Sequence, residues 1–93
     1  MDFNTELSRI NQILASQGIK LRIEKRRELL NLRGPLPCSI EKDKVKIQRI
    51  SLHLNADQEG LKEAQEILRL VHYQLKHKQF NWDHWSPQKS QKL

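Results

Sequence analysis

Cationic and amide side chains alternate with aliphatic ones in three short stretches of the chain, residues 19–24, 29–33 and 44–54. In a β-strand, successive side chains point to opposite faces, so each stretch would have one apolar and one polar face. Arginine and lysine donate to phosphates and to guanine, whereas asparagine and glutamine pair with adenine. The chemistry that these stretches predict is non-covalent recognition of a polyanion.

The candidate contact residues are those placed on the polar face of the predicted sheet by the alternation, together with a β-bulge near residues 48–49 that sets two adjacent side chains on the same side. They are Lys20, Arg22, Asn31, Arg33, Lys44, Lys46, Gln48, Arg49 and Ser51. Glu24 is the one acid expected on this face. A charged outer face is also the default for any half-solvated sheet, so it is the shortage of acids that favours a polyanionic partner.

The net charge of +6 is concentrated in the middle of the chain. Residues 20–49 hold ten Lys or Arg against four Asp or Glu and so carry +6, whereas residues 1–19 carry −1 and residues 50–93 carry +1. Solubility alone predicts mixed signs throughout, so this concentration favours nucleic acid as the partner. All five aromatic residues lie outside residues 19–54. Sheets that bind single strands stack bases on aromatic side chains, so duplex DNA is the better match.

Neither catalysis nor metal binding is indicated by the residue types and their spacing. Metal-ligand spacing is absent from the histidines and the single cysteine, which are His53, His72, His77, His84 and Cys38. The three glycines form no phosphate-cradling cluster. The chain is therefore expected not to be an enzyme by itself, and to use no cofactor, metal or small-molecule substrate.

The hydrophobic pattern predicts an α+β fold, in which a short N-terminal helix precedes a three-stranded antiparallel sheet packed on one C-terminal amphipathic helix. The first helix is expected within residues 1–18, the sheet within 19–54 and the second helix over 57–78. Together they form a single domain over residues 1–85, followed by a flexible tail or the start of a linker at 86–93.

The third stretch contains a change of phase. Val45 and Ile47 occupy one set of alternate positions, whereas Ile50 and Leu52 occupy the other. If all four face the core, one extra residue must be inserted near residues 48–49, which is a β-bulge. The alternative is that Val45 and Ile47 are exposed at the start of the strand. We favour the bulge.

Prolines and aromatic residues predict how the ends of the sheet are closed. Pro35 and Pro37 cannot donate to a ladder of hydrogen bonds, so the second strand is expected to stop before them and a loop to follow. Phe80, Trp82 and Trp85 are expected to fold back over the open end of the core.

The C-terminal helix carries an apolar stripe that includes Leu61, Leu68 and Leu75. Packing against the sheet is the favoured interpretation. The alternative is a protein-interaction module that uses this Leu61–Leu75 seam, or the Trp82 and Trp85 segment, to bind a partner.

The cellular compartment is predicted from the absence of membrane-spanning and signal-peptide patterns in the sequence. No apolar run approaches the roughly 20 residues that span a bilayer, and the N-terminus lacks the pattern of a signal peptide. A single cysteine, Cys38, fits a reducing environment. A cytoplasmic, nucleoid-associated location without a membrane partner is expected.

The segments "IEKRRELLNLRGPLP" as strand, turn and strand, "QRISLHL" as a third strand and "GLKEAQ" as the start of a helix form a familiar order. Over residues 19–85 this order resembles the N-terminal arm-type DNA-binding domain of phage-like tyrosine recombinases, the site-specific integrases. The resemblance implies a sheet that lies in the major groove of arm-type sites in double-stranded DNA, and it leaves other recombinase protomers open as partners. A DNA-binding transcriptional regulator with a similar sheet and helix is the alternative.

In that family, core-binding and catalytic domains follow the arm domain, and the catalytic domain carries an Arg/His/Tyr set. Tyr73 of this chain lies in the middle of the predicted helix, so the role of nucleophile is not carried over to it. The chain also departs from many arm domains because it lacks an aromatic residue in the strands and has the proline-rich loop "GPLPCS".

Overall fold

The computed structural model describes residues 2–38 and 43–85 of the 93-residue chain, so the predicted tail at 86–93 lies outside the described residues. The elements, in chain order, are α1 (Phe3–Ser16), β1 (Arg22–Arg26), β2 (Leu29–Pro37), β3 (Val45–Asn55), α2 (Gln58–Lys76) and the short α3 (Trp82–Trp85). The three strands form one antiparallel sheet in the order β1-β2-β3. The predicted α+β fold is confirmed.

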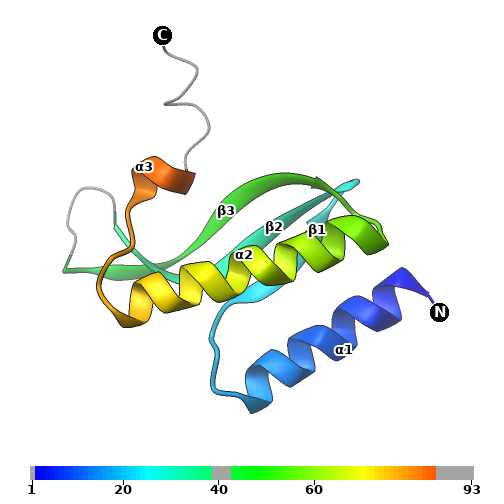
Figure 1. Ribbon diagram of the computed structural model, residues 1–93, viewed down its shortest axis with the longest axis horizontal. Helices are drawn as coiled ribbons and strands as arrows, with labels where there is room; N and C mark the ends of the chain where they lie inside the picture. Colours follow the sequence, from blue (N-terminus) through cyan, green and yellow to red (C-terminus); the bar gives the residue numbers. More distant parts are fainter. Residues whose placement is uncertain (1, 39–42, 86–93) are drawn as a thin grey trace, which may run out of the picture.

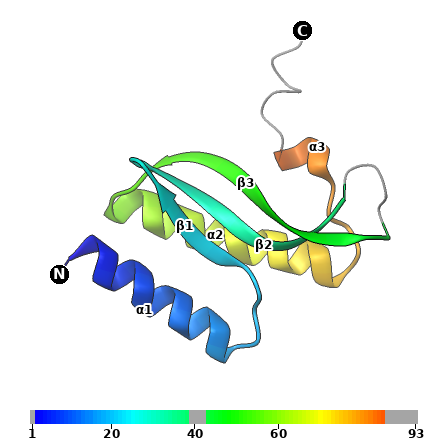
Figure 2. The ribbon, with the colours of Figure 1, turned by 180° about the vertical axis from the view of Figure 1, so that it is seen from behind.

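The sheet has one covered face and one open face. Figure 1 shows α2 running across one face of the sheet, with α1 beside it along β1. We call this covered face the inner face and the opposite one the outer face. Seen from behind in Figure 2, the strands lie in front of α2, and none of the described helices crosses the outer face.

Capping residues fix where the helices begin and end. Asp57 is the N-cap of α2, where its carboxylate accepts a hydrogen bond of 2.7 Å from the Gly60 amide. A Cβ atom at Gly60 would lie 1.9 Å from the carbonyl oxygen of Asn55, so the tight entry into α2 requires glycine. Gly18 follows α1 with φ +76°, the left-handed conformation that ends many helices.

The hydrophobic core lies between the inner face and the helices. It is formed by Ile10, Leu14, Ile19, Leu21, Ile23, Leu30, Leu32, Leu36, Ile50, Leu61, Ala64, Leu68 and Val71. In the apolar stripe of α2, Leu61 and Leu68 are buried and Leu75 packs against the core. Packing on the sheet is therefore confirmed for the Leu61–Leu75 seam.

The C-terminal aromatic residues close one end of the core, as predicted. The Trp82 indole Nε1 donates a 2.6 Å hydrogen bond to the Pro37 carbonyl, and Trp85 Nε1 donates one of 3.1 Å to the Gln74 side chain. Phe80 meets Trp82 edge to face, with ring centroids 5.2 Å apart. Burying these indoles while bonding their N–H groups attaches α3 to both layers of the fold.

The bulge predicted near residues 48–49 is wrong. The register of β2 and β3 runs without a break through Arg33–Arg49, Gly34–Gln48 and Pro35–Ile47. The irregularity lies farther along β3, between the partners of Leu30 and Asn31, where His53 has φ 58°. Since alternate residues keep their faces up to that point, Val45 and Ile47 point outward.

Their exposure confirms the alternative interpretation of the phase change. Val45 is 61% and Ile47 is 58% exposed, whereas Ile50 on the inner face is 1% exposed. The two apolar phases therefore belong to the two faces of β3, which has no bulge between Val45 and Ile50.

The expectation that Pro35 and Pro37 stop the second strand is also wrong, because β2 continues through Pro37 opposite Val45. The pairing of β1 with β2 ends at Arg33. Beyond that residue, β2 has a neighbour on one side only, and a proline nitrogen on the open side costs no hydrogen bond.

The free edge of β1 is covered by α1. The Asn11 side chain donates to the Ile23 carbonyl oxygen and accepts from the Ile23 amide, both at 3.0 Å. Asn11 thus supplies to Ile23 the pair of hydrogen bonds that a further strand would supply, and it fixes α1 against the sheet. No helix in the described part of the chain is long and apolar enough to span a membrane.

Candidate nucleic-acid interface

Three arginines line up across the outer face. In the register of the sheet, Arg22 of β1 lies opposite Arg33 of β2, and Arg33 lies opposite Arg49 of β3. Directly opposed residues point to the same face, and neighbouring strands lie about 4.8 Å apart, so three cations cross the sheet within about 10 Å. We call these residues the arginine row.

The members of the arginine row have different partners. Arg22 is half-buried, and its Nη1 donates to the carbonyl oxygens of Ile19 and Leu21. Arg49 is ion-paired with Glu24. Arg33 is exposed, and its guanidinium makes no hydrogen bond or ion pair with another described residue. Like charges placed directly opposite each other destabilise a sheet, so this row suits an anionic ligand rather than stability.

The ion pair of Glu24 and Arg49 crosses the middle strand. Glu24 Oε1 accepts from Arg49 Nε at 2.6 Å and Glu24 Oε2 accepts from Nη2 at 3.3 Å, although β2 lies between their strands. Asn31 of β2 stands between Glu24 and Ser51 on the same face. With the two long side chains joined across it, Asn31 is only 9% exposed.

Charges around Glu24 keep its carboxylate ionised. The hydrogen bond from Arg49 lowers the pKa of Glu24, the fields of Arg26 and Arg33 lower it further, and partial burial opposes them. The same hydrogen bond raises the pKa of Arg49. At neutral pH both groups are charged, so the negative charge of Glu24 balances the positive charge of Arg49.

A shallow depression lies beside this ion pair, at the β1–β2 turn. It is lined by Glu24, Lys25, Arg26, Arg27, Leu29, Asn31 and Ser51. Polar groups of Asn31 and Ser51 thus border a space that is surrounded by cations. The depression is open enough to receive the edge of a base or a phosphate rather than to enclose a small molecule.

Arg26 belongs to this face and was missed by the sequence analysis. The segment 25–28 was assigned to a polar turn, but β1 begins and ends later than predicted and includes Arg26. Two residues beyond Glu24, Arg26 points outward as Arg22 and Glu24 do. The sequence contains a signal for this placement, because Arg22, Glu24 and Arg26 occupy alternate positions in the segment around Ile23.

Five of the nine predicted contact residues are brought together on the outer face, and four are not. The five are Arg22, Asn31, Arg33, Arg49 and Ser51. Lys20 is exposed in the segment before β1, and Lys44 lies before β3, where its carbonyl accepts a 2.8 Å hydrogen bond from the Cys38 amide.

The outward orientation predicted for Lys46 and Gln48 is wrong, because β3 has no bulge between them and Ile50. Lys46 is paired with the buried Leu36, so it follows the inner-face phase and reaches solvent at the end of the sheet. The Gln48 amide donates to the carbonyl oxygens of Leu36 and Pro37, at 3.0 and 3.2 Å. Gln48 is thereby occupied in holding the end of β2.

The apolar part of the outer face adjoins its basic part. Ile47, two residues before Arg49 and on the same face, lies opposite Pro35, and Val45 lies opposite Pro37. Exposed aliphatic groups beside arginines match the mixture of methyl groups and acceptors in a DNA major groove.

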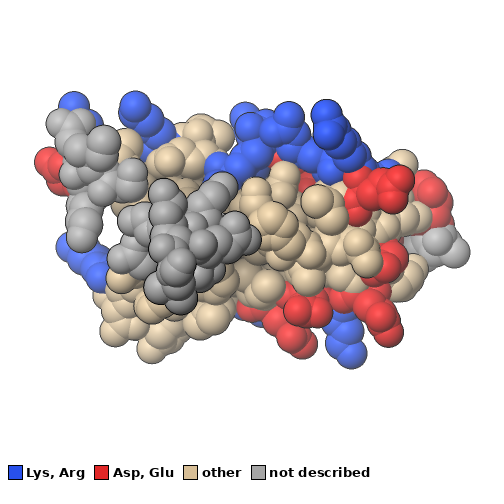
Figure 3. Space-filling view, turned by 90° about the horizontal axis from the view of Figure 1, so that it is seen from above, with Lys and Arg blue, Asp and Glu red and all other residues tan. Residues whose placement is uncertain are grey.

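Charge is segregated between the two layers of the molecule. In Figure 3, Lys and Arg gather along the upper side, which is the outer face of the sheet, while Asp and Glu gather along the α2 side and at one end. Glu59, Glu63 and Glu66 are exposed on α2. The sheet side is therefore the side that attracts a polyanion.

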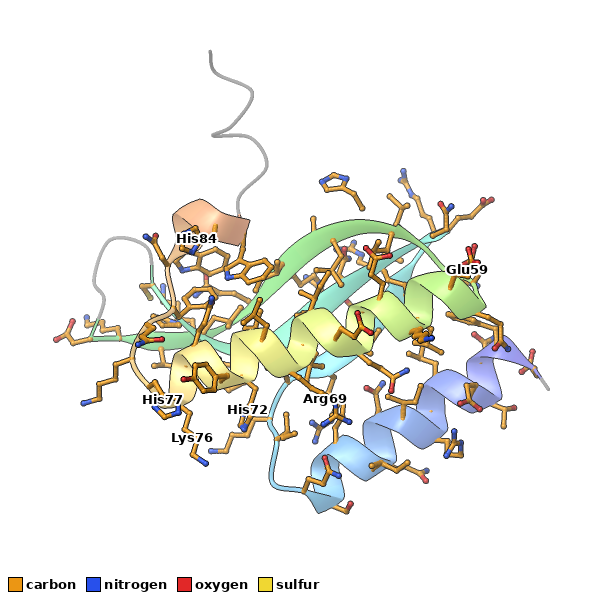
Figure 4. The ribbon with its side chains drawn as sticks, viewed as in Figure 1. Glu59, Arg69, His72, Lys76, His77 and His84 are labelled. Atoms are coloured by element: carbon orange, nitrogen blue, oxygen red, sulfur yellow. The ribbon has the colours of Figure 1, made fainter. Side chains whose placement is uncertain are left out.

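The C-terminal half of α2 carries a smaller group of cationic and titratable residues. Figure 4 shows Arg69, His72, Lys76 and His77 along the side of α2 that faces away from α3. The first three come from α2 and His77 is the C-cap that follows it, and no group of three or more metal-binding side chains is found among the described residues. A solvated flank accounts for them.

Comparison with known proteins identifies a family. A protein-family model described as the XisA/XisC N-terminal domain matches residues 1–92. No curated protein and no solved structure matches significantly.

Proposed function

Since this chain belongs to the XisA/XisC N-terminal domain family, we propose that it binds double-stranded DNA through the outer face of its sheet. The members of this family are N-terminal domains of excisionase-like recombination proteins. Membership supports a DNA-binding role in site-specific recombination. The match extends over the whole described fold, so the proposal concerns the domain as a unit.

The arginine row is the observation that carries this proposal. It places three cations side by side on the one face that the described helices leave open, and Arg33 in the middle has no protein partner among the described residues. Phosphate contacts from such residues supply affinity and orientation, while Asn31, Ser51 and Arg49 are of the types that contact base edges.

The position of the aromatic residues favours duplex over single-stranded nucleic acid. Phe3, Phe80, Trp82 and Trp85 pack against the core, and Tyr73 is exposed on α2. The described strands therefore offer bases no Phe, Tyr or Trp ring to stack on, whereas phosphates and groove edges need none.

The finer role that we propose is that of an arm-site-binding module in a tyrosine recombinase. The sheet would lie in the major groove, and other domains of the recombinase would carry out strand exchange. Three antiparallel strands with a polar outer face and one helix behind them are what the resemblance of residues 19–85 implies. Support for this role comes from the family match together with a basic sheet whose described strands contain no Phe, Tyr or Trp.

Fluorescence anisotropy with a labelled mixed-sequence duplex tests the proposal. Each phosphate contact adds about 0.9 to the salt slope, so about four contacts would lower the affinity roughly a hundredfold between about 50 and 200 mM salt. A single strand of the same sequence should compete less well than the duplex. Equal competition by the single strand, or binding that ignores salt, would contradict a duplex-binding sheet.

A further inference from the structure

We infer that Glu24 is a positioning residue that turns Arg49 into a sequence reader selective for guanine. This inference rests on the proposed function and adds to it the base that the face selects. Glu24 is the one acid among the outward-pointing residues of the described strands, and its carboxylate holds Arg49 from the far side of the sheet.

The geometry of the ion pair leaves the reading edge of Arg49 free. A guanidinium has five N–H donors in a planar fork. Glu24 engages one side of that fork, Nε and Nη2, at 2.6 and 3.3 Å. Nη1 and the second hydrogen of Nη2 remain, and they form the end of the fork. Two parallel donors are what the O6 and N7 acceptors of guanine require.

Fixing the side chain changes which ligand it prefers. A free arginine reaches any nearby phosphate, whereas one held by a carboxylate has its charge balanced and its plane fixed. The arginine row then contains two kinds of cation. Arg33, which has no described partner, is suited to phosphate, and Arg49, which is 43% exposed in its side chain but held by Glu24, is suited to a base edge.

The surroundings of the pair place it where a base would arrive. Asn31 and Ser51 border the depression beside Glu24, so the held arginine lies next to polar groups of the types that read bases. Arg26 and Arg33 lie close enough to Glu24 for their fields to act on it, and they are placed to grip the phosphates on either side.

The test compares affinity with discrimination in matched variants. Duplexes are selected from a randomised library with the wild-type domain, and the preferred guanine position is identified. Dissociation constants are then measured for that duplex and for one in which this G·C pair is replaced by A·T. The variants are Glu24→Gln, Glu24→Asp, Arg49→Ala and the double variant Glu24→Gln/Arg49→Ala, with Glu28→Gln as the control.

Glu28 is a matched control because Glu28→Gln changes the net charge by the same amount. Glu28 lies in the exposed β1–β2 turn, and its side chain has no partner among the described residues. Any effect of charge alone should therefore appear in both variants.

The expected result is a split between affinity and selectivity. Glu24→Gln should bind the replaced duplex as tightly as wild type or more tightly, because an acid has been removed, while the preference for guanine falls about tenfold. Glu24→Asp should retain part of the preference, and Glu24→Gln should not change the guanine preference further once Arg49 is alanine.

Other outcomes overturn the inference or the proposed function separately. An unchanged guanine preference in Glu24→Gln, or an equal loss in Glu28→Gln, would overturn the inference while leaving DNA binding by the sheet intact. If the wild-type domain binds no duplex in a salt-dependent way, the proposed function fails and this inference fails with it.

Discussion

Arg49 of β3 donates two hydrogen bonds to Glu24 of β1, although the whole of β2 lies between them. The pair joins the two outer strands on the open face and covers Asn31, which stands beneath it. A contact between residues 25 positions apart in sequence thus organises the centre of the proposed DNA-binding surface.

The first prediction concerns pH. Binding to Arg49 lowers the pKa of Glu24 below its unfolded value, so the carboxylate favours folding only while it is ionised. This contribution is complete above the unfolded-state pKa of about 4.3 and is lost as the pH falls through the lower folded-state pKa. Glu24→Gln should therefore lower the melting temperature at pH 7 and have no effect in strong acid. A difference from wild type that stays constant down to the lowest pH would show that the ion pair does not contribute.

The second prediction tests the phase of β3 with two isoleucines of one strand. Ile50 is 1% exposed and Ile47 is 58% exposed. Ile50→Ala should reduce the free energy of unfolding by about 2–5 kcal/mol, because it leaves a cavity in the core. Ile47→Ala should cost less than about 1 kcal/mol. Urea unfolding measures both, and similar costs would mean that Ile47 also faces the core.

The third prediction concerns the attachment of α1. Asn11→Ala removes both hydrogen bonds to the Ile23 backbone and leaves its amide and carbonyl without a protein partner. The expected loss of unfolding free energy is about 1–3 kcal/mol. The neighbouring Gln12 is exposed on α1, so Gln12→Ala provides the control and should change stability by no more than about 0.5 kcal/mol. Equal stabilities of the two variants would exclude the role assigned to Asn11.

The fourth prediction separates the two faces of the molecule. Arg33→Ala should weaken duplex binding severalfold for every sequence and reduce the salt slope by about one, as expected for a lost phosphate contact. Lys62→Ala removes the same charge from the exposed side of α2 and should leave both quantities unchanged. Equal losses in the two variants would point to net charge rather than to the sheet.

Much of the fold was predictable because its signals are local. The cap at Asp57, the end of α1 at Gly18 and the apolar stripe of α2 each follow from residues a few positions apart. The two wrong predictions about the sheet, the bulge in the third strand and the end of the second strand at its prolines, concern features that depend on the neighbouring strand. Val45 and Ile47 are apolar but exposed, and only the pairing of Ile50 with Leu32 shows which phase faces the core.

The candidate site was less predictable for the same reason. Alternation identified Arg22 and Arg33, but the arginine row exists only because the register sets Arg49 beside them. Glu24 was recognised as the one acid on the outer face, but its ion pair with Arg49 was not predicted. Arg49 lies on β3, a strand with which β1 does not pair. Long-range register is not encoded in any short stretch of sequence.

The most direct test of the central claim is a residue-resolved NMR titration of the isotope-labelled domain with a mixed-sequence duplex at two salt concentrations. We expect shifts to gather at Arg22, Arg26, Arg33, Arg49 and Ser51, to fade as the salt is raised, and to spare the exposed side of α2. Shifts confined to α2 or α3, or a sheet that does not respond at low salt, would contradict the claim that the outer face binds DNA.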